Sequence, residues 1–159
     1  MKDMSIMFVC TGNICRSPLA HTVLEHMAEE RGLKEGLFIE SSGTGAWHVG
    51  EKADPRMRQV ALNHGIRITH RSKKLRYSDI ADFDLILVMD QHNFQDTLAL
   101  CRDDEERKKV RLFRDYDTRG EGDVPDPWYG GMEGFEEVWS IVHRVCENLI
   151  GHILSDTLI

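Results

Sequence analysis

The segment FDLILVMD, residues 83–90, constrains the fold of this chain more than any other stretch. Its consecutive apolar residues, 85–89, have the pattern of a β-strand covered on both faces, which is typical of a parallel sheet between two layers of helices. Shorter apolar runs at residues 5–9, 37–40 and 110–113 predict three further strands. Because helical patterns separate these runs, we expect an α/β fold of three layers, with a four-stranded parallel sheet of the flavodoxin-like type.

Start and stop signals delimit the predicted helices. Ser17 and Pro18 predict the beginning of the first helix, with the serine hydroxyl as N-cap and proline at the first helical position, and Gly32 ends it. Further helices are predicted over residues 54–63, 93–100 and 133–153. We expect residues 66–80 to be irregular with a short helical turn, and the charged run 102–111 to be a solvated helix end.

Length and charge limit the possible partners of the chain. No linker or repeat divides it, so we expect residues 1–159 to form a single domain. With 20 basic and 27 acidic residues its net charge is −7, which disfavours nucleic acid and anionic membrane surfaces as partners. No apolar run approaches the roughly 20 residues of a membrane span, and the start lacks the features of a signal peptide. We therefore expect a cytoplasmic protein whose four cysteines are reduced.

The sequence FVCTGNICRSP combines thiols with features that bind an anion. Cys10 follows the first predicted strand and a helix begins shortly after it, so free backbone N–H groups and the helix dipole favour an anion there. Gly12 and Asn13 suit a tight turn, and the planar fork of Arg16 matches phosphate oxygens. The same surroundings favour a thiolate. By themselves, Cys10 and Cys15 are compatible with a metal pair, a redox pair, buried packing, or a nucleophile with a neighbour.

The predicted sheet brings other loops to Cys10. Loops that leave the carboxyl ends of parallel strands lie along one edge, where ligands bind. These loops are expected at residues 10–17, 41–48, 90–92 and 114–131. Asp126 stands in the last of them between Pro125 and Pro127, which restrict the backbone. We therefore expect Asp126 to reach the site of Cys10.

CTGNICRSP, together with DPWYGG at residues 126–131, resembles the low-molecular-weight protein tyrosine phosphatases. The resemblance covers nearly the whole chain and includes Ser41-x-Gly43-Thr44, Trp47, NHGI at 63–66, His70 and Met89-Asp90. It implies the phosphotyrosine phosphatase I type of fold, and a reaction in which Cys10 takes the phosphoryl group from an aryl phosphate. Asp126 would protonate the leaving oxygen and then act as base for the water that releases phosphate. No cofactor and no metal would be required.

The resemblance also implies roles for the residues around these two. The phosphate-binding residues would be Thr11, Gly12, Asn13, Ile14, Cys15, Arg16 and Ser17. A hydrogen-bond network that holds the loop would join Asn13, Ser17, Ser41 and His70, and Asp90 would help to fix Arg16. The walls of the cleft would be Ile14, Trp47, Trp128 and Tyr129, which suit an aryl ring. Trp128 departs from the tyrosine or phenylalanine commoner in the family, which puts substrate preference in doubt.

The sequence disfavours three alternative activities. A thiol-dependent arsenate reductase needs relay cysteines after the third strand, and residues 82–93 contain none. A silent phosphate-binding module would not need both Cys10 and Asp126. In this family threonine at the position of Ile14 accompanies a protein-arginine phosphatase, so isoleucine favours phosphotyrosine. We expect a phosphotyrosine protein or peptide as partner, and a monomer or weak homodimer.

The remaining cysteines and histidines point to no metal. For Cys15, packing behind the loop and a reversible disulfide with Cys10 that prevents over-oxidation both stay open. Cys101 and Cys146 lie in helical patterns and are expected to be structural or inert. Neither His-Glu-x-x-His nor Cys-x-x-Cys occurs in the sequence, which disfavours zinc.

Overall fold

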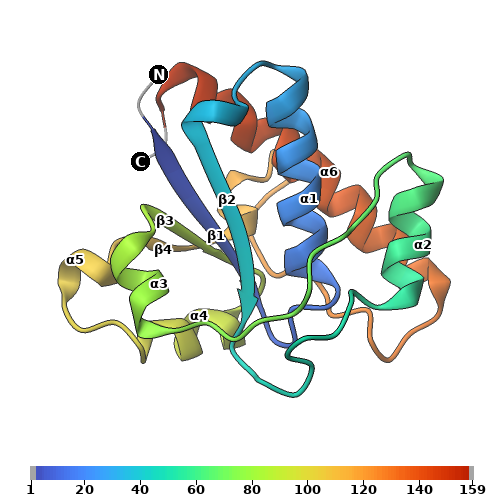
Figure 1. The fold of residues 1–159 in the computed structure, drawn as a ribbon, viewed down its shortest axis with the longest axis horizontal. Helices are drawn as coiled ribbons and strands as arrows, with labels where there is room; N and C mark the ends of the chain where they lie inside the picture. The colour runs from blue at the N-terminus through green and yellow to red at the C-terminus, as the bar shows by residue number, and fades with distance from the viewer. Residues whose placement is uncertain (1–2, 158–159) are drawn as a thin grey trace.

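A four-stranded parallel sheet forms the centre of the computed structural model, which describes residues 3–157 (Figure 1). The strands are β1 (Met4–Cys10), β2 (Leu37–Gly43), β3 (Leu85–Val88) and β4 (Val110–Leu112), in the order β2-β1-β3-β4. All three neighbouring pairs are parallel, so every strand ends at the same edge of the sheet. The predicted fold class is confirmed.

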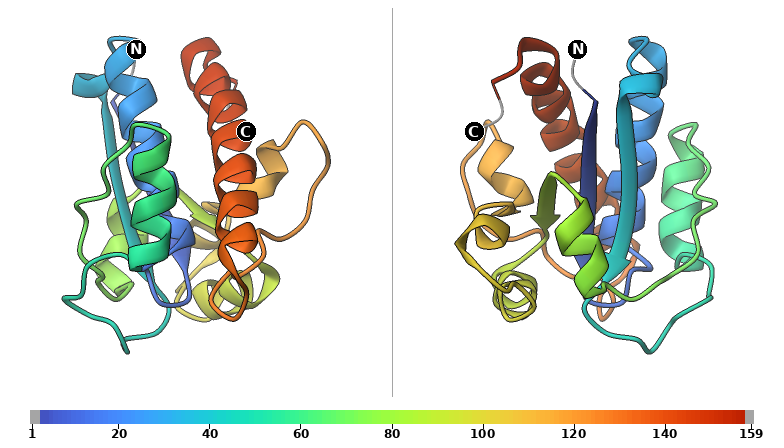
Figure 2. Two further views of the ribbon diagram at one scale, coloured as in Figure 1. Left: turned by 90° about the vertical axis from the view of Figure 1, so that its right-hand side faces the viewer. Right: turned by 60° about the vertical axis from the view of Figure 1, so that its left-hand side comes forward.

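Helices cover both faces of this sheet (Figure 2). One face carries α1 (Arg16–Glu30), α2 (Pro55–Asn63) and α6 (Met132–Ser155). The other carries α3 (Tyr77–Asp82), α4 (Gln91–Leu98) and α5 (Asp104–Arg107). Two 3-10 turns, η1 (Lys34–Gly36) and η2 (Phe113–Tyr116), complete the elements. Within residues 3–157, no helix is both long and apolar enough to cross a membrane.

The two helical layers explain why the central strands are apolar throughout. Ile6 and Phe8 of β1 pack in the cluster that includes α1 and α6, whereas Met7 and Val9 pack in the cluster that includes α3 and β4. Successive side chains of a strand point to opposite faces, so a strand between two layers buries all of them. All four of these side chains are fully buried.

Two predicted details of the helices are wrong. The N-cap of α1 is Cys15 and not Ser17, because the Ser17 hydroxyl is engaged by the Cys10 sulfur and the Asn13 amide. The charged run 102–111 is not a helix end but contains the separate short helix α5, whose Glu106 is buried and paired with Arg102. A carboxylate this buried needs a charged partner, which the same run supplies.

The segment from residue 66 to residue 76 is irregular, as predicted, with isolated bridges at residues 71 and 74, and the short helix α3 follows it. It runs past the end of β2, where Gly43 forms a bridge with Lys74. This path carries His70 and Ser72 to the back of the loop that follows β1. Cys101 lies beyond the end of α4, outside the helix predicted for it.

Candidate active site

Cys10 is the last residue of β1, at the carboxyl edge of the sheet between β2 and β3. This position is the topological switch point of an open parallel sheet, where a crevice forms. The thiol is almost fully buried, and its Sγ lies 2.9 Å from the Oγ of Ser17. The opening loop, residues 10–17, turns back through Asn13, which adopts a left-handed conformation with φ of 56°. A tight turn was expected at Gly12 and Asn13, and Asn13 is the residue that adopts the left-handed conformation.

The backbone of the opening loop is arranged to receive an anion. Its carbonyl groups accept hydrogen bonds from outside the loop: Thr11 from Gly45 N, Gly12 from Ser72 Oγ, and Ile14 from Asp54 N. For the N–H groups of residues 12–16, by contrast, the described part of the chain offers no acceptor. Free N–H groups at the N-terminus of a 15-residue helix form a site for a phosphate-like anion.

The backbone approaches closely at Gly43, at the end of β2. A Cβ atom there would lie 2.6 Å from the carbonyl oxygen of Thr11 and 3.1 Å from the N atom of Asn13. Both contacts are to backbone atoms, which have little room to move. Only glycine allows β2 to support the opening loop at this distance.

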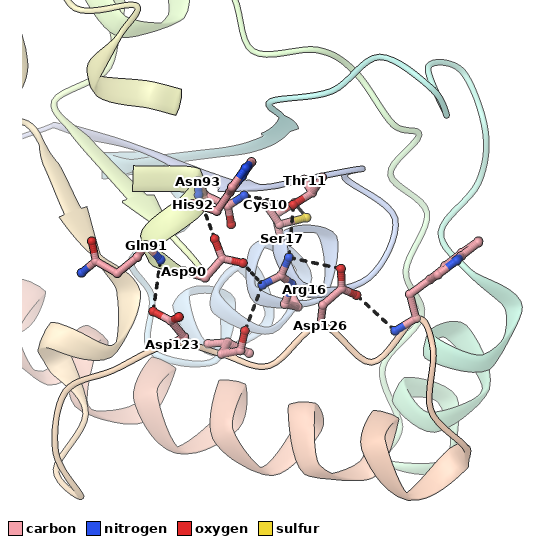
Figure 3. A network of polar contacts seen from close by, with 12 residues as sticks. Cys10, Thr11, Arg16, Ser17, Asp90, Gln91, His92, Asn93, Asp123 and Asp126 are labelled. Carbon is pink, nitrogen blue, oxygen red and sulfur yellow. Dashed lines mark hydrogen bonds and ion pairs between the residues drawn. The ribbon is translucent and has the colours of Figure 1, made fainter. Parts of the chain in front are cut away.

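Arg16 is a buried cation beside the thiol (Figure 3). Its Nη1 donates to Asp90 Oδ2 at 2.7 Å and to the carbonyl oxygen of Val124 at 2.9 Å. Burial opposes the charge, but the neighbouring Cys10 and Asp90 outweigh it and raise the pKa of Arg16. The predicted contact between Asp90 and Arg16 is present, and Asp90 also caps α4 by accepting from Asn93 N.

Asp126 reaches the same site from the final loop, residues 117–131, which connects η2 to α6. Its Oδ2 lies 3.7 Å from Arg16 Nη2, and its Oδ1 accepts a hydrogen bond from Trp128 N at 3.1 Å (Figure 3). The side chain is 45% exposed, so the carboxylate is accessible to a bound molecule. A buried thiol and an accessible carboxyl therefore share one cleft.

The cleft has a volume of about 280 Å³ and is lined by Cys10, Asp126 and the residues expected as walls: Ile14, Trp47, Trp128 and Tyr129. His48 is one further wall residue that the sequence did not predict; it hydrogen bonds Glu51, and its ring lies 5.5 Å from the Trp128 ring. A larger hollow of about 490 Å³ lies between α1, β2 and residues 65–70, but none of its lining residues is a nucleophile of the cysteine or serine type.

A chain of hydrogen bonds runs from His70 to the thiol. His70 Nε2 lies 2.8 Å from Asn13 Oδ1, and Asn13 Nδ2 donates to Ser17 Oγ at 2.7 Å. Because an amide oxygen only accepts, the hydrogen must be on His70 Nε2. Since Ser17 Oγ accepts from Asn13, its own hydrogen can go to the Cys10 sulfur at 2.9 Å or to the carbonyl oxygen of Ser42 at 3.4 Å, and the sulfur is the nearer acceptor. This series of hydrogen bonds is oriented to stabilise a thiolate at Cys10.

Ser41 is connected only indirectly to this series of hydrogen bonds. Its Oγ lies 3.0 Å from His21 Nδ1, and the His21 ring packs edge to face with that of His70 at 5.0 Å between centroids. The prediction that Ser41 belongs directly to the network is therefore wrong, because His21 lies between Ser41 and His70. Asn93 was also missed: its fully buried Nδ2 donates to Thr11 Oγ1 at 3.1 Å. Neither residue belongs to a motif, so no local signal in the sequence indicates it.

His70 makes the stability of the protein depend on pH. Burial, and next the neighbouring His21, lower its pKa to about 4, against opposing effects of Glu40 and Glu25. In the unfolded chain a histidine takes up its proton near pH 6.5. Between about pH 6.5 and 4 the unfolded state therefore binds more protons, and the free energy of unfolding falls as the pH falls.

We expect a loss of about 1–2 kcal/mol near pH 4, which is less than 1.36 kcal/mol for each unit of pKa difference would give, because His70 is only partly buried and solvent screens its charge. Urea unfolding at several pH values between 4 and 7 would measure it. His70→Gln keeps a donor for Asn13 but cannot titrate, so its stability should change less over this range. Parallel pH curves for the two proteins would contradict the assignment.

Cys15 lies behind the opening loop and does not compete with Cys10. Burial, and next the neighbouring Cys10, strongly raise the pKa of its thiol, which keeps it protonated. The thiol packs in the main hydrophobic cluster, and all four cysteines are free. The packing role is thus satisfied, and a disulfide with Cys10 stays a prediction. Over residues 3–157, no group of three His, Cys, Asp or Glu side chains is placed to hold a metal ion.

Comparisons with known proteins relate the whole chain to one family. The family model described as low molecular weight phosphotyrosine protein phosphatase matches residues 5–157. The phosphatase of that name from Schizosaccharomyces pombe is 43% identical over 155 residues, which cover 96% of this chain and 98% of the relative. A low molecular weight protein-tyrosine-phosphatase from Streptomyces coelicolor is 39% identical, with coverage of 93% and 92%. The crystal structure of a protein tyrosine phosphatase from Entamoeba histolytica superposes with a TM-score of 0.93 at 37% identity, covering 98% of this chain and 100% of that one.

Proposed function

Because the chain belongs to the low molecular weight phosphotyrosine protein phosphatase family, we propose that Cys10, Arg16 and Asp126 hydrolyse phosphotyrosine through a cysteinyl-phosphate. The observation that carries this proposal is the position of the Cys10 sulfur. It lies at the base of a loop whose N–H groups are free, beside the buried cation Arg16. A nucleophile in an anion site attacks the bound anion itself, which here is a phosphoryl group.

In the first step the Cys10 thiolate forms a bond to phosphorus while the bond from phosphorus to the phenolic oxygen breaks. Asp126, in its acid form, donates a proton to that oxygen, so that a neutral phenol leaves. The N–H groups of the opening loop and the guanidinium of Arg16 stabilise the charge on the three other phosphoryl oxygens. The hydroxyl of Ser17, directed at the sulfur, stabilises the thiolate before this step.

In the second step water attacks the cysteinyl-phosphate. Asp126, now a carboxylate, accepts a proton from the water as the new bond to phosphorus forms. The bond between phosphorus and sulfur breaks, inorganic phosphate is released, and Cys10 leaves as a thiolate. The same hydrogen bond from Ser17 then stabilises the leaving group. The proton that Asp126 gave in the first step is thus recovered in the second.

The substrate side of the proposal rests on the cleft walls. Trp47 and Tyr129 are 74% and 93% exposed, and with Trp128 they form an aromatic rim above the anion site. Flat apolar surfaces suit the ring of phosphotyrosine. We include in the proposal a phosphotyrosine protein or peptide as substrate, a single domain, a monomer or weak homodimer, and a cytoplasmic location.

We expect kcat/KM for phosphotyrosine peptides to exceed that for matched phosphoserine peptides by at least about 100-fold, since a serine side chain cannot fill the aromatic rim. EDTA should leave both rates unchanged, because no step needs a metal. Ile14→Thr should raise the rate on phosphoarginine peptides relative to phosphotyrosine. A wild-type preference for phosphoarginine would assign the chain to the arginine phosphatases instead, and inactivation by EDTA would exclude the metal-free mechanism.

A further inference from the structure

A buried ionic cluster fastens the beginning of the final loop. Asp117 is the first residue of that loop, and its side chain is fully buried. Arg144 of α6 contacts it at two points, with Nε 2.9 Å from Oδ1 and Nη2 2.8 Å from Oδ2. Arg114 of η2 donates from Nε to Oδ2 at 2.9 Å. One carboxylate thus joins η2, the final loop and α6.

Arg114 extends this anchor along the loop. Its Nη1 donates to the carbonyl oxygen of Asp123 at 3.0 Å, and its Nη2 donates to that of Gly120 at 3.1 Å. The guanidinium is planar, so the contact of Nε with Asp117 also fixes the directions of the other two nitrogens. The final loop has no regular secondary structure over residues 117–127. Its path from 120 to 123 is therefore set largely by Arg114.

The next residue connects the loop to the catalytic arginine. Val124 N donates to the carbonyl oxygen of Met89 at 2.7 Å, and Val124 O accepts from Arg16 Nη1 at 2.9 Å. Asp126 follows after Pro125, whose ring restricts the backbone between them. A shift of residues 120–124 would thus move the acceptor of Arg16 and the carboxyl of Asp126 together.

We propose that the cluster of Arg114, Asp117 and Arg144 positions the final loop for catalysis, orienting Arg16 through Val124 and holding Asp126 at the leaving-group oxygen. This inference rests on the proposed function. Separately, the hydrogen bond from Arg144 lowers the pKa of Asp117 far below its usual range, so the cluster is charged at every pH at which the protein is assayed. A cluster that only stabilised the fold would leave the chemistry of the folded protein unchanged.

Asp117→Asn tests the inference, because it keeps the shape of the side chain and removes the charge and one acceptor. We expect kcat/KM for phenyl phosphate, a poor leaving-group substrate, to fall about 10- to 100-fold, as for a catalytic group displaced by about 1 Å. The loss with p-nitrophenyl phosphate should be under about 5-fold, since its leaving group needs less protonation. This smaller loss reports the effect through Arg16, which loses the orientation given by Val124 but keeps its contact with Asp90. Asp126→Asn is measured in the same series, so that a failure of the acid assignment is seen separately.

Glu106→Gln is the matched control. Glu106 is also a buried carboxylate paired with an arginine, Arg102, but it lies on α5 and contacts no part of the final loop. Its neutralisation should lower the melting temperature and change both kcat/KM values equally, by less than about 2-fold. If Asp117→Asn behaves like Glu106→Gln, with lowered stability and equal effects on the two substrates, the inference is wrong.

A second readout needs no turnover. The indole N–H of Trp128 reports on the final loop, and Trp128→Phe would identify it among the signals of the three tryptophans. We expect Asp117→Asn to shift or broaden that NMR signal, and an unchanged signal would also overturn the inference. If Asp117→Asn does not fold, Arg114→Lys tests the inference instead, with the same comparison of the two substrates and the same NMR signal of Trp128. It leaves the contact between Arg144 and Asp117 intact, but a single ammonium group cannot replace both bonds to the loop carbonyls.

Discussion

Replacing Cys10 with serine is expected to lower kcat/KM for p-nitrophenyl phosphate by at least about 10⁴-fold, a typical loss for a missing nucleophile. The free N–H groups of the opening loop and Arg16 favour a thiolate, whereas a serine hydroxyl does not ionise there near neutral pH. Serine is smaller than cysteine and retains a polar partner for Ser17, so the fold should survive. Steady-state kinetics, with thermal unfolding in parallel, would measure both effects.

The same variant separates binding from chemistry. Inorganic phosphate should bind to Cys10→Ser with a Kd within about 10-fold of the wild type, because the N–H groups and Arg16 that hold the anion are unchanged (10-fold corresponds to about 1.4 kcal/mol). Cys101→Ser is the control, since that thiol lies beyond α4 and outside the cleft. It should retain full activity. A Cys10→Ser enzyme with more than a few per cent of wild-type activity would exclude Cys10 as the nucleophile.

Asp126→Asn should produce the second largest loss, about 10²- to 10³-fold in kcat/KM for phenyl phosphate, in the range of general acid catalysis. An amide cannot donate a proton to the leaving oxygen, and phenolate is a poor leaving group without one. The loss with p-nitrophenyl phosphate should be clearly smaller.

Asp123→Asn is the control for a charge change in the same loop. Asp123 is exposed and its Oδ1 accepts from Gln91 N, which an asparagine oxygen can also do. Its effect should be small and equal for both substrates. If Asp126→Asn slows the two substrates by the same factor, the carboxyl of Asp126 is not the proton donor.

The fold was predictable because its signals are local. The apolar run at 83–90 indicated a strand between two helical layers, and β3 is buried at every position. The helix predicted over residues 54–63 is present as α2, with Asp54 as its N-cap and Pro55 as its first residue. The predicted N-cap at Ser17 is wrong, because the hydroxyl that could cap the helix is bound here by the Cys10 sulfur and the Asn13 amide. At Ser17 the tertiary partners outweigh the local preference for capping.

The sequence by itself indicated the anion site and, through the family resemblance, the reacting groups that we propose. A cysteine, free N–H groups and an arginine within one strand-to-helix turn need no distant partner to form an anion site, so their chemistry can be inferred from spacing. Only the tertiary structure decided how that site is held. His21, Asn93 and Asp117 stabilise it through contacts with residues that are 20, 82 and 27 positions away in the chain. Such contacts depend on how helices and loops pack against the sheet, and no short-range pattern records that packing.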